Sequence, residues 1–186
     1  MTMVVLGLCG SLRRGSYNRR LLEAAGLPRG VTLEVYEGLA DVPPYNEDND
    51  EDSATPEAVR ALRDVITAAD AVLIATPEYN ASAPGQLKNA LDWVSRPFPD
   101  NALRNKPVAV VGASTGLFGA VWAQAELRKV LKTIGAHVVE EELPVGQAHD
   151  AFAPDGGLAN SNLRSALADL VDQLLGEVRT RVDQPA

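Results

Sequence analysis

The stretch VVLGLCGSLRRGSYN, residues 4–18, joins an apolar run directly to a polar loop. Residues 4–9 carry no charged side chain, which is typical of a strand in a parallel sheet that helices cover on both faces. The nine residues that follow contain two glycines, two serines, two arginines and an asparagine. Ligands of open parallel sheets bind beyond the carboxyl ends of the strands, so this junction predicts a binding site.

The same arrangement occurs again later in the chain. Residues 71–75 form a second apolar run, and Pro77-Glu78-Tyr79-Asn80 follows it. Further strand-like runs lie at residues 31–36, 108–112 and 137–139, and apolar residues at helical spacing separate the runs or follow the last one. Strands that alternate with helices predict an α/β fold with a doubly wound, five-stranded parallel sheet and helices on both faces.

The positions of the two polar loops indicate the strand order. Polar loops suited to binding a ligand follow the first and third strands. This placement fits the strand order 2-1-3-4-5, in which the winding reverses between those two strands. The chain has 186 residues and shows no repeat and no second core pattern. We therefore expect one domain over residues 1–186.

Charge and cysteine content narrow the functional class. The formal net charge is −8, which disfavours non-specific binding to nucleic acid or to an anionic membrane surface. The single cysteine, Cys9, allows no internal disulfide and no cysteine cluster for a metal. We expect no metal site, no signal peptide and no membrane span, and hence a cytoplasmic protein.

The loop after the first strand has the composition of a phosphate site. A helix is expected to begin near Asn18, and the first turn of a helix offers free N–H groups and a partial positive charge. Ser11 and Ser16 add hydroxyl donors, and Arg13 adds a charged one. The alternative is that Ser16 and Asn18 only cap the helix. The loop lacks G-x-x-x-x-G-K-[ST] and G-x-G-x-x-G, which disfavours nucleotide hydrolysis and a Rossmann dinucleotide.

The loop after the third strand suits a flat polar ring. Pro77 and Pro84 stiffen it, and a stiff loop holds main-chain donors and acceptors at fixed positions. A tight turn with a packed Tyr79 is the alternative. A small-residue loop at residues 112–119 follows the neighbouring fourth strand and permits close approach of a ligand. A phosphate loop beside a ring loop suggests flavin mononucleotide (FMN).

Two charged segments have less definite meanings. The acidic run at residues 47–52 is expected to be a solvated loop, with metal binding as the minor alternative. Arg14, Arg19 and Arg20 form a small basic patch beside the phosphate loop. The patch is either a solvated helix face or a contact for the extra phosphate of NADPH.

On these motifs the chain resembles the NADPH-dependent FMN reductase family, which has a flavodoxin-like fold. The resemblance rests on the G-S-x-R-x-x-S-x-N pattern from Gly10 to Asn18 and on Pro77-Glu78-Tyr79-Asn80 with the helix after it, and it fades beyond Val139. It implies homodimers or homotetramers with the flavin near a subunit interface. It also implies a set of FMN contacts, which are Ser11, Arg13, Ser16, Tyr17 and Asn18 at the phosphate and ribityl chain, Pro77, Glu78, Tyr79 and Asn80 at the ring and ribityl chain, and Ser114, Thr115 and Gly116 on the far side.

The resemblance implies an oxidoreductase, and the sequence offers no good candidate for a catalytic acid or base. NADPH or NADH would pass a hydride to FMN, and a quinone, free flavin, azo dye or metal oxyanion would then take the electrons in a ping-pong cycle. A flavodoxin-type electron carrier that never meets NAD(P)H is the main alternative. A receiver domain is a weak one, because Ser11, Arg13 and Ser16 stand where receivers place acidic residues.

Overall fold

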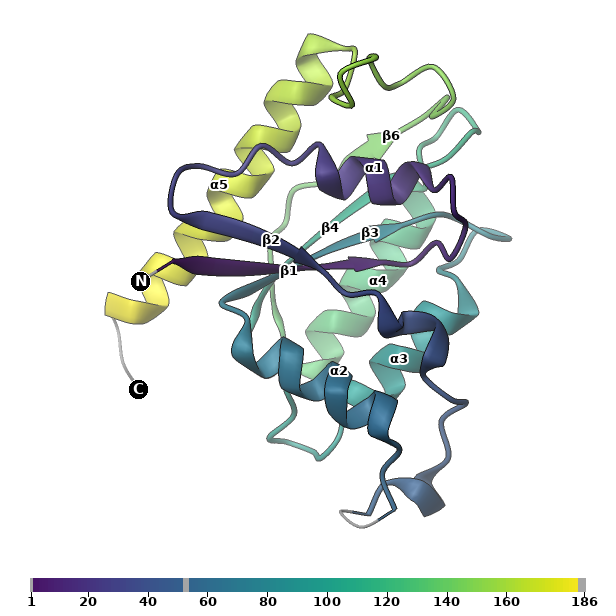
Figure 1. Cartoon of the computed structure of the whole chain (residues 1–186), viewed down its shortest axis with the longest axis vertical. Coiled ribbons are helices and arrows are strands. Elements are labelled where there is room, and N and C mark those ends of the chain that lie inside the picture. Colours follow the sequence, from purple (N-terminus) through teal and green to yellow (C-terminus); the bar gives the residue numbers. More distant parts are fainter. Residues whose placement is uncertain (1, 52–53, 184–186) are drawn as a thin grey trace.

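The computed structural model describes residues 2–51 and 54–183, which form a parallel sheet between two layers of helices (Figure 1). The predicted strand order is confirmed, since the hydrogen-bonded path is β2-β1-β3-β4-β5 and every pair is parallel. The elements are β1 Met3–Cys9, α1 Tyr17–Glu23, β2 Val31–Val35, α2 Glu57–Ala68, β3 Ala71–Thr76, α3 Gly85–Val94, β4 Pro107–Ala113, α4 Val121–Ile134, β5 His137–Val138, β6 Leu143–Val145 and α5 Ser161–Asp183, with short 3₁₀ turns at Gly38–Asp41 and Glu47–Asn49.

The sheet separates two cores. Alternate residues of each central strand point to opposite faces, so Leu73 and Ala75 join the core under α1 and α5. Val72 and Ile74 join the core under α2, α3 and α4. Every residue of β3 is buried, which explains why its sequence is apolar without alternation.

The sheet has six strands rather than the predicted five, because its edge strand is broken in two. β5 pairs with the start of β4, at Pro107 and Val108, and β6 pairs with the end of β4, at residues 111–113. Three consecutive glutamates, residues 140–142, lie between the two pieces. β6 is only three residues long and contains Pro144, which lacks the N–H of a ladder and gives no strand signal in the sequence.

The acidic run begins outside the sheet, in the connection between β2 and α2. Most of the acidic run is a surface turn, and its Asp50 pairs with Arg63 at 2.7 Å. Asp52, the last member of that run, lies outside the described residues. None of the helices that the structure describes is both long and apolar enough to cross a membrane.

Candidate functional site

Three loops leave the carboxyl ends of the neighbouring strands β1, β3 and β4 and meet around one cavity of about 100 Å³. This convergence is what the predicted strand order requires, because the winding reverses at β1 and β3. The cavity brings together nine of the twelve residues that the sequence predicts as cofactor contacts; Ser16, Asn80 and Gly116 are the three outside its lining. The lining residues are Ser11, Arg13, Tyr17, Asn18, Pro77, Glu78, Tyr79, Ala113, Ser114 and Thr115.

The loop after β1 presents unused main-chain donors. Among the described residues, no acceptor takes a hydrogen bond from the N–H groups of residues 11–15. Arg13 forms no ion pair within the described part of the chain, and its guanidinium lies 6.0 Å from the centroid of the Tyr17 ring. Free N–H groups and an unpaired guanidinium at one cavity suit a phosphate dianion.

Ser16 has the structural role that the sequence left as an alternative. Its side chain is buried, and its Oγ accepts a hydrogen bond of 3.2 Å from the N–H of Arg19. Ser16 is therefore the N-cap of α1, and its hydroxyl also lies 3.6 Å from the Sγ of Cys9. A cap at this position fixes where the phosphate loop ends and the helix begins.

Asn18 ties two of the three loops together. Its Nδ2 donates to the carbonyl of Ala113 at 2.9 Å, and its Oδ1 accepts from the N–H of Ala113 at 2.9 Å. Because the side chain is buried, both bonds are made away from water. Only the second N–H of the amide is left for a ligand, so the first task of Asn18 is to hold the start of α1 against the end of β4.

The loop after β3 contains a tight turn. The N–H of Tyr79 donates to the carbonyl of Ser82 at 3.0 Å, and the N–H of Ser82 donates back at 3.2 Å. Asn80 and Ala81 between them have φ angles of 55° and 59°, which is a left-handed pair typical of a type I′ turn. The turn leaves the Tyr79 side chain half exposed, rather than packed as in the alternative interpretation.

Two carboxylates fasten this loop to α4. Glu78 Oε2 accepts from the N–H groups of Trp122 and Ala123 at 3.0 and 3.1 Å and so caps a helix whose own N-cap, Ala120, has no side-chain acceptor. Glu126 accepts from Ser82 Oγ at 2.6 Å and from a main-chain N–H of the loop. These hydrogen bonds hold the pKa of the Glu126 carboxyl below its usual value, and the bond from the Ser82 hydroxyl has the larger effect.

The loop after β4 depends on a second segment, residues 143–148, which no sequence motif connects with the site. Residues 143–148 accept a hydrogen bond from Ser114 N–H and donate to the carbonyls of Ser114 and Gly116 at 2.9–3.0 Å. Gly119 makes this contact possible, because a Cβ there would lie 2.5 Å from the main chain of Pro144. Gly119 has a φ of 58°, a left-handed conformation that the sequence alone does not reveal.

Large apolar side chains stand exposed beside the cavity. We call Tyr79, Leu117, Phe118 and Trp122 the apolar rim; each is at least half exposed. Phe118 and Trp122 meet edge to face with their ring centroids 5.1 Å apart. Exposed aromatic and aliphatic groups of this kind, on two loops and the first turn of α4, are typical of a surface that receives an apolar or aromatic ligand.

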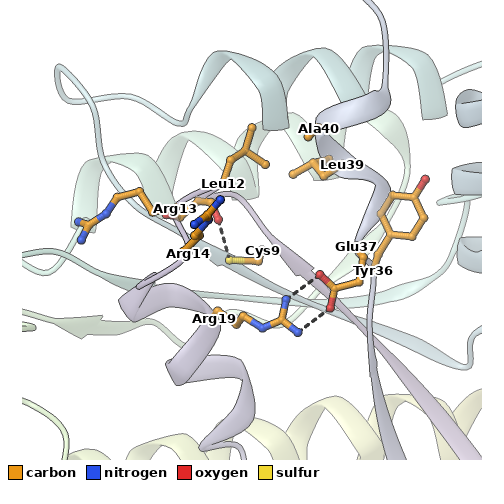
Figure 2. A pocket seen from close by; sticks show the side chains of 10 residues that line it. Cys9, Leu12, Arg13, Arg14, Arg19, Tyr36, Glu37, Leu39 and Ala40 are labelled. Carbon is orange, nitrogen blue, oxygen red and sulfur yellow. Dashed lines mark hydrogen bonds and ion pairs between the residues drawn. The ribbon is translucent and has the colours of Figure 1, made fainter.

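A second hollow of about 380 Å³ adjoins the first and shares Ser11 and Arg13 with it. Figure 2 shows Arg19 directed at Glu37, with its two terminal nitrogens bonded to the two carboxylate oxygens at 2.7 and 2.5 Å. The hydrogen bonds of Arg19 to Glu37 and, with a smaller effect, to Glu23 raise the pKa of the Arg19 guanidinium. The same bond to Arg19 lowers the pKa of the Glu37 carboxyl. The predicted basic patch is thus partly neutralised, since Arg19 is paired; Arg20 lies over the ring of Phe152 instead.

The cavity between the three loops fits part of FMN rather than all of it. About 100 Å³ encloses a phosphate group with the start of a ribityl chain. A tricyclic ring would then lie outside, over the loops at 77–80 and 114–116 and beside the apolar rim. The residues present therefore suit a cofactor with a buried anion and an accessible ring.

The sequence matches a known protein family and several of its characterised members. The family model for NADPH-dependent FMN reductase matches residues 3–150. The chain is 43% identical over 173 residues to an NAD(P)H-dependent FMN reductase of Pseudomonas aeruginosa, covering 91% of this chain and 92% of that protein. It is 34% identical over 184 residues to a 2-hydroxy-1,4-benzoquinone reductase of a Burkholderia species, covering 97% and 99%.

A solved structure is similar over nearly the whole fold. The flavoenzyme NAD(P)H:(acceptor) oxidoreductase FerB from Paracoccus denitrificans superposes with a TM-score of 0.82 at 35% identity. The match covers 96% of this chain and 98% of that one. The family match over residues 3–150 spans all three loops around the cavity.

Proposed function

Because this chain belongs to the NADPH-dependent FMN reductase family, we propose that it reduces quinones, free flavins, azo dyes or metal oxyanions with NAD(P)H through FMN bound at the three loops. It is an NAD(P)H-dependent oxidoreductase that uses FMN. The observation that carries the proposal is the meeting of these loops at a cavity with unused main-chain donors.

The phosphate of FMN is assigned to the loop after β1. The N–H groups of residues 11–15, the hydroxyl of Ser11 and the guanidinium of Arg13 supply donors there, with no competing carboxylate in the cavity except Glu78. Glu78 already accepts two hydrogen bonds from α4. Ser16 and Asn18 support this site by shaping the loop, and Tyr17 forms one of its walls.

The ring is assigned to the loops after β3 and β4. Pro77 and the turn at Asn80 keep the first loop rigid, and Ser114, Thr115 and Gly116 lie opposite on the second. FMN supplies the redox chemistry when bound, since its ring takes up a hydride and gives up electrons singly or in pairs. Main-chain dipoles held by these loops stabilise the negative charge of the reduced ring, as preorganised donors do elsewhere.

A ping-pong cycle follows if the bound flavin ring has a single accessible face. The nicotinamide and the acceptor both need the open side of the site, which Tyr79, Phe118 and Trp122 border. The oxidised nucleotide must leave before the acceptor binds in the same place. We assign no side chain as a catalytic acid or base, because the cavity carboxylate of Glu78 is occupied as a helix cap.

We further propose a homodimer or homotetramer in which the subunit interface lies near the flavin. Apolar side chains of the rim are exposed in a single chain, at the edge of the sheet to which the flavin is assigned. Burial of such groups is the main driving force of stable association. Light scattering of the purified protein is expected to give a mass of two or four chains; a monomer at micromolar concentration would contradict the proposal.

The test is steady-state turnover of the protein with FMN, NADPH and a simple benzoquinone in the absence of oxygen. We expect NADPH oxidation that needs both FMN and quinone, with parallel lines in double-reciprocal plots at several quinone concentrations. Intersecting lines would contradict the proposal that the nicotinamide and the acceptor bind in turn at the same face of the flavin. FMN binding without any NADPH oxidation would instead favour the flavodoxin-type electron carrier.

A further inference from the structure

The connector between β6 and α5 contains a closed hairpin-like loop. Ala159 N–H donates to the carbonyl of Ala151 at 2.9 Å, and Ala153 N–H donates to the carbonyl of Gly157 at 2.8 Å. Between these bonds, Phe152 pairs with Leu158 in an antiparallel bridge. Leu158 is buried in the core, so the loop is anchored and Phe152 is held in a defined place.

Arg164 fastens the same loop to the last helix. Its Nη1 donates to the carbonyls of Leu158 and Ala159 at 2.6 and 2.8 Å. The loop is therefore braced from the core side by Leu158 and from α5 by Arg164. This bracing fixes the loop where the Phe152 ring meets the Tyr17 ring of α1.

Three pairwise contacts to aromatic rings link Phe152, Tyr17, Arg13 and Arg20, which we call the stack. Its ring is nearly parallel to that of Tyr17, with an interplanar angle of 10° and centroids 6.2 Å apart. The guanidinium of Arg20 lies 4.4 Å from the Phe152 centroid, and that of Arg13 lies 6.0 Å from the Tyr17 centroid. The order is thus Arg20, Phe152, Tyr17, Arg13, and only the last two line the cavity.

The stack holds two arginines without neutralising them. Aromatic faces attract a guanidinium through their quadrupole and leave its net charge in place. Arg19 in the same helix shows the contrasting case, because Glu37 and Glu23 pair with it. Within the described residues, Arg13 and Arg20 have no carboxylate partner, so their charge remains available to an anion near the cavity.

We propose that Phe152 is a positioning residue for the phosphate of FMN and acts through Tyr17 on Arg13. This inference rests on the proposed function. Phe152 does not touch the cavity; it restrains the Tyr17 ring, and the ring in turn limits the conformations that Arg13 samples before the phosphate binds. A donor that is already ordered loses less conformational entropy on binding, which raises affinity.

The test compares FMN with riboflavin, which lacks the phosphate. Dissociation constants of both flavins are measured by fluorescence titration for the wild type, F152A, F152Y and the control H149A, an exposed position in the same connector. We expect F152A to bind FMN about 3- to 10-fold more weakly and to bind riboflavin as the wild type does. F152Y retains the stacking ring and is expected to restore FMN affinity, and H149A is expected to bind both flavins normally.

A double-mutant cycle checks the route through Arg13. If Phe152 acts on the phosphate through that guanidinium, F152A should weaken FMN binding in the wild type and have almost no further effect in R13A. Equal effects in both backgrounds, or an equal loss of FMN and riboflavin affinity in F152A, would overturn the inference. A wild type that binds FMN no better than riboflavin would overturn the phosphate site itself, whereas a preference for FMN that F152A keeps would overturn the role of Phe152 alone.

Discussion

Asn18 and Ala113 are 95 residues apart in the sequence and exchange two hydrogen bonds of 2.9 Å in the core. The side-chain amide of Asn18 imitates a peptide group and pairs with Ala113 as a neighbouring strand would. This pairing joins the first turn of α1 to the last residue of β4. These two hydrogen bonds therefore hold the start of the helix after the phosphate loop against the start of the far-side loop.

Replacing Asn18 with Ala should destabilise the fold markedly. The change leaves the N–H and the carbonyl of Ala113 without these partners, and each buried polar group left unsatisfied costs about 1–3 kcal/mol. We expect the free energy of unfolding in urea to fall by about 2–4 kcal/mol. N162A, at the exposed start of α5, serves as the control. If N18A lowered the free energy of unfolding no more than N162A does, the stabilising role of the Asn18–Ala113 hydrogen bonds would be contradicted.

Glu78 should contribute to stability as a cap for α4. E78A removes the acceptor for the N–H groups of Trp122 and Ala123, and loss of a helix cap costs about 1 kcal/mol. E78Q keeps one oxygen acceptor and should lose less. Thermal unfolding of the three proteins tests the order wild type, then E78Q, then E78A; equal stability of all three would show that the carboxylate has no capping role.

Gly119 should resist substitution although it lies in a loop. A Cβ there would come within 2.5 Å of the main chain of Pro144 and Val145, and the residue also has a φ of 58°. We expect G119A to lose roughly 2–5 kcal/mol of unfolding free energy, from overpacking and left-handed strain together. At Gly116 the nearest atom is 3.5 Å away, so G116A is the matched control and should change stability by less than about 1 kcal/mol.

The turn at Asn80 and Ala81 offers a stabilising change. Both residues are left-handed, and glycine adopts that conformation without the strain that alanine has there. A81G should raise the free energy of unfolding by about 0.5–1 kcal/mol. Chemical denaturation measures this directly, and a destabilised A81G would mean that the turn is not under this strain.

Much of the fold could be predicted from the sequence because its central strands are buried on both faces. Residues 71–75 and 108–112 are apolar without alternation, and the observed β3 and β4 extend each run by no more than one residue at either end. β6 could not be predicted in this way. It has three residues and includes Pro144, so neither hydrophobic period nor strand propensity identifies it.

The site was predictable at the level of loops and less so at the level of individual side chains. Loop composition after three strands predicted where the cavity lies, and the family resemblance supplied nine of the residues that line it; their contact with FMN stays a prediction. It did not separate ligand contacts from supports such as Ser16, whose cap depends on where α1 begins. Phe152 and residues 143–148 were missed, because their role depends on contacts between segments that are distant in the sequence.

The most direct test of the central claim is an FMN titration of the wild type, R13A and R14A. Arg13 lines the cavity between the three loops, whereas Arg14 lines only the adjoining hollow. A charged hydrogen bond to phosphate is worth about 1.5–3 kcal/mol, so R13A should bind FMN about 10- to 100-fold more weakly while R14A stays within about threefold of the wild type. Equal affinity of R13A and the wild type, or no FMN binding by the wild type, would contradict the account.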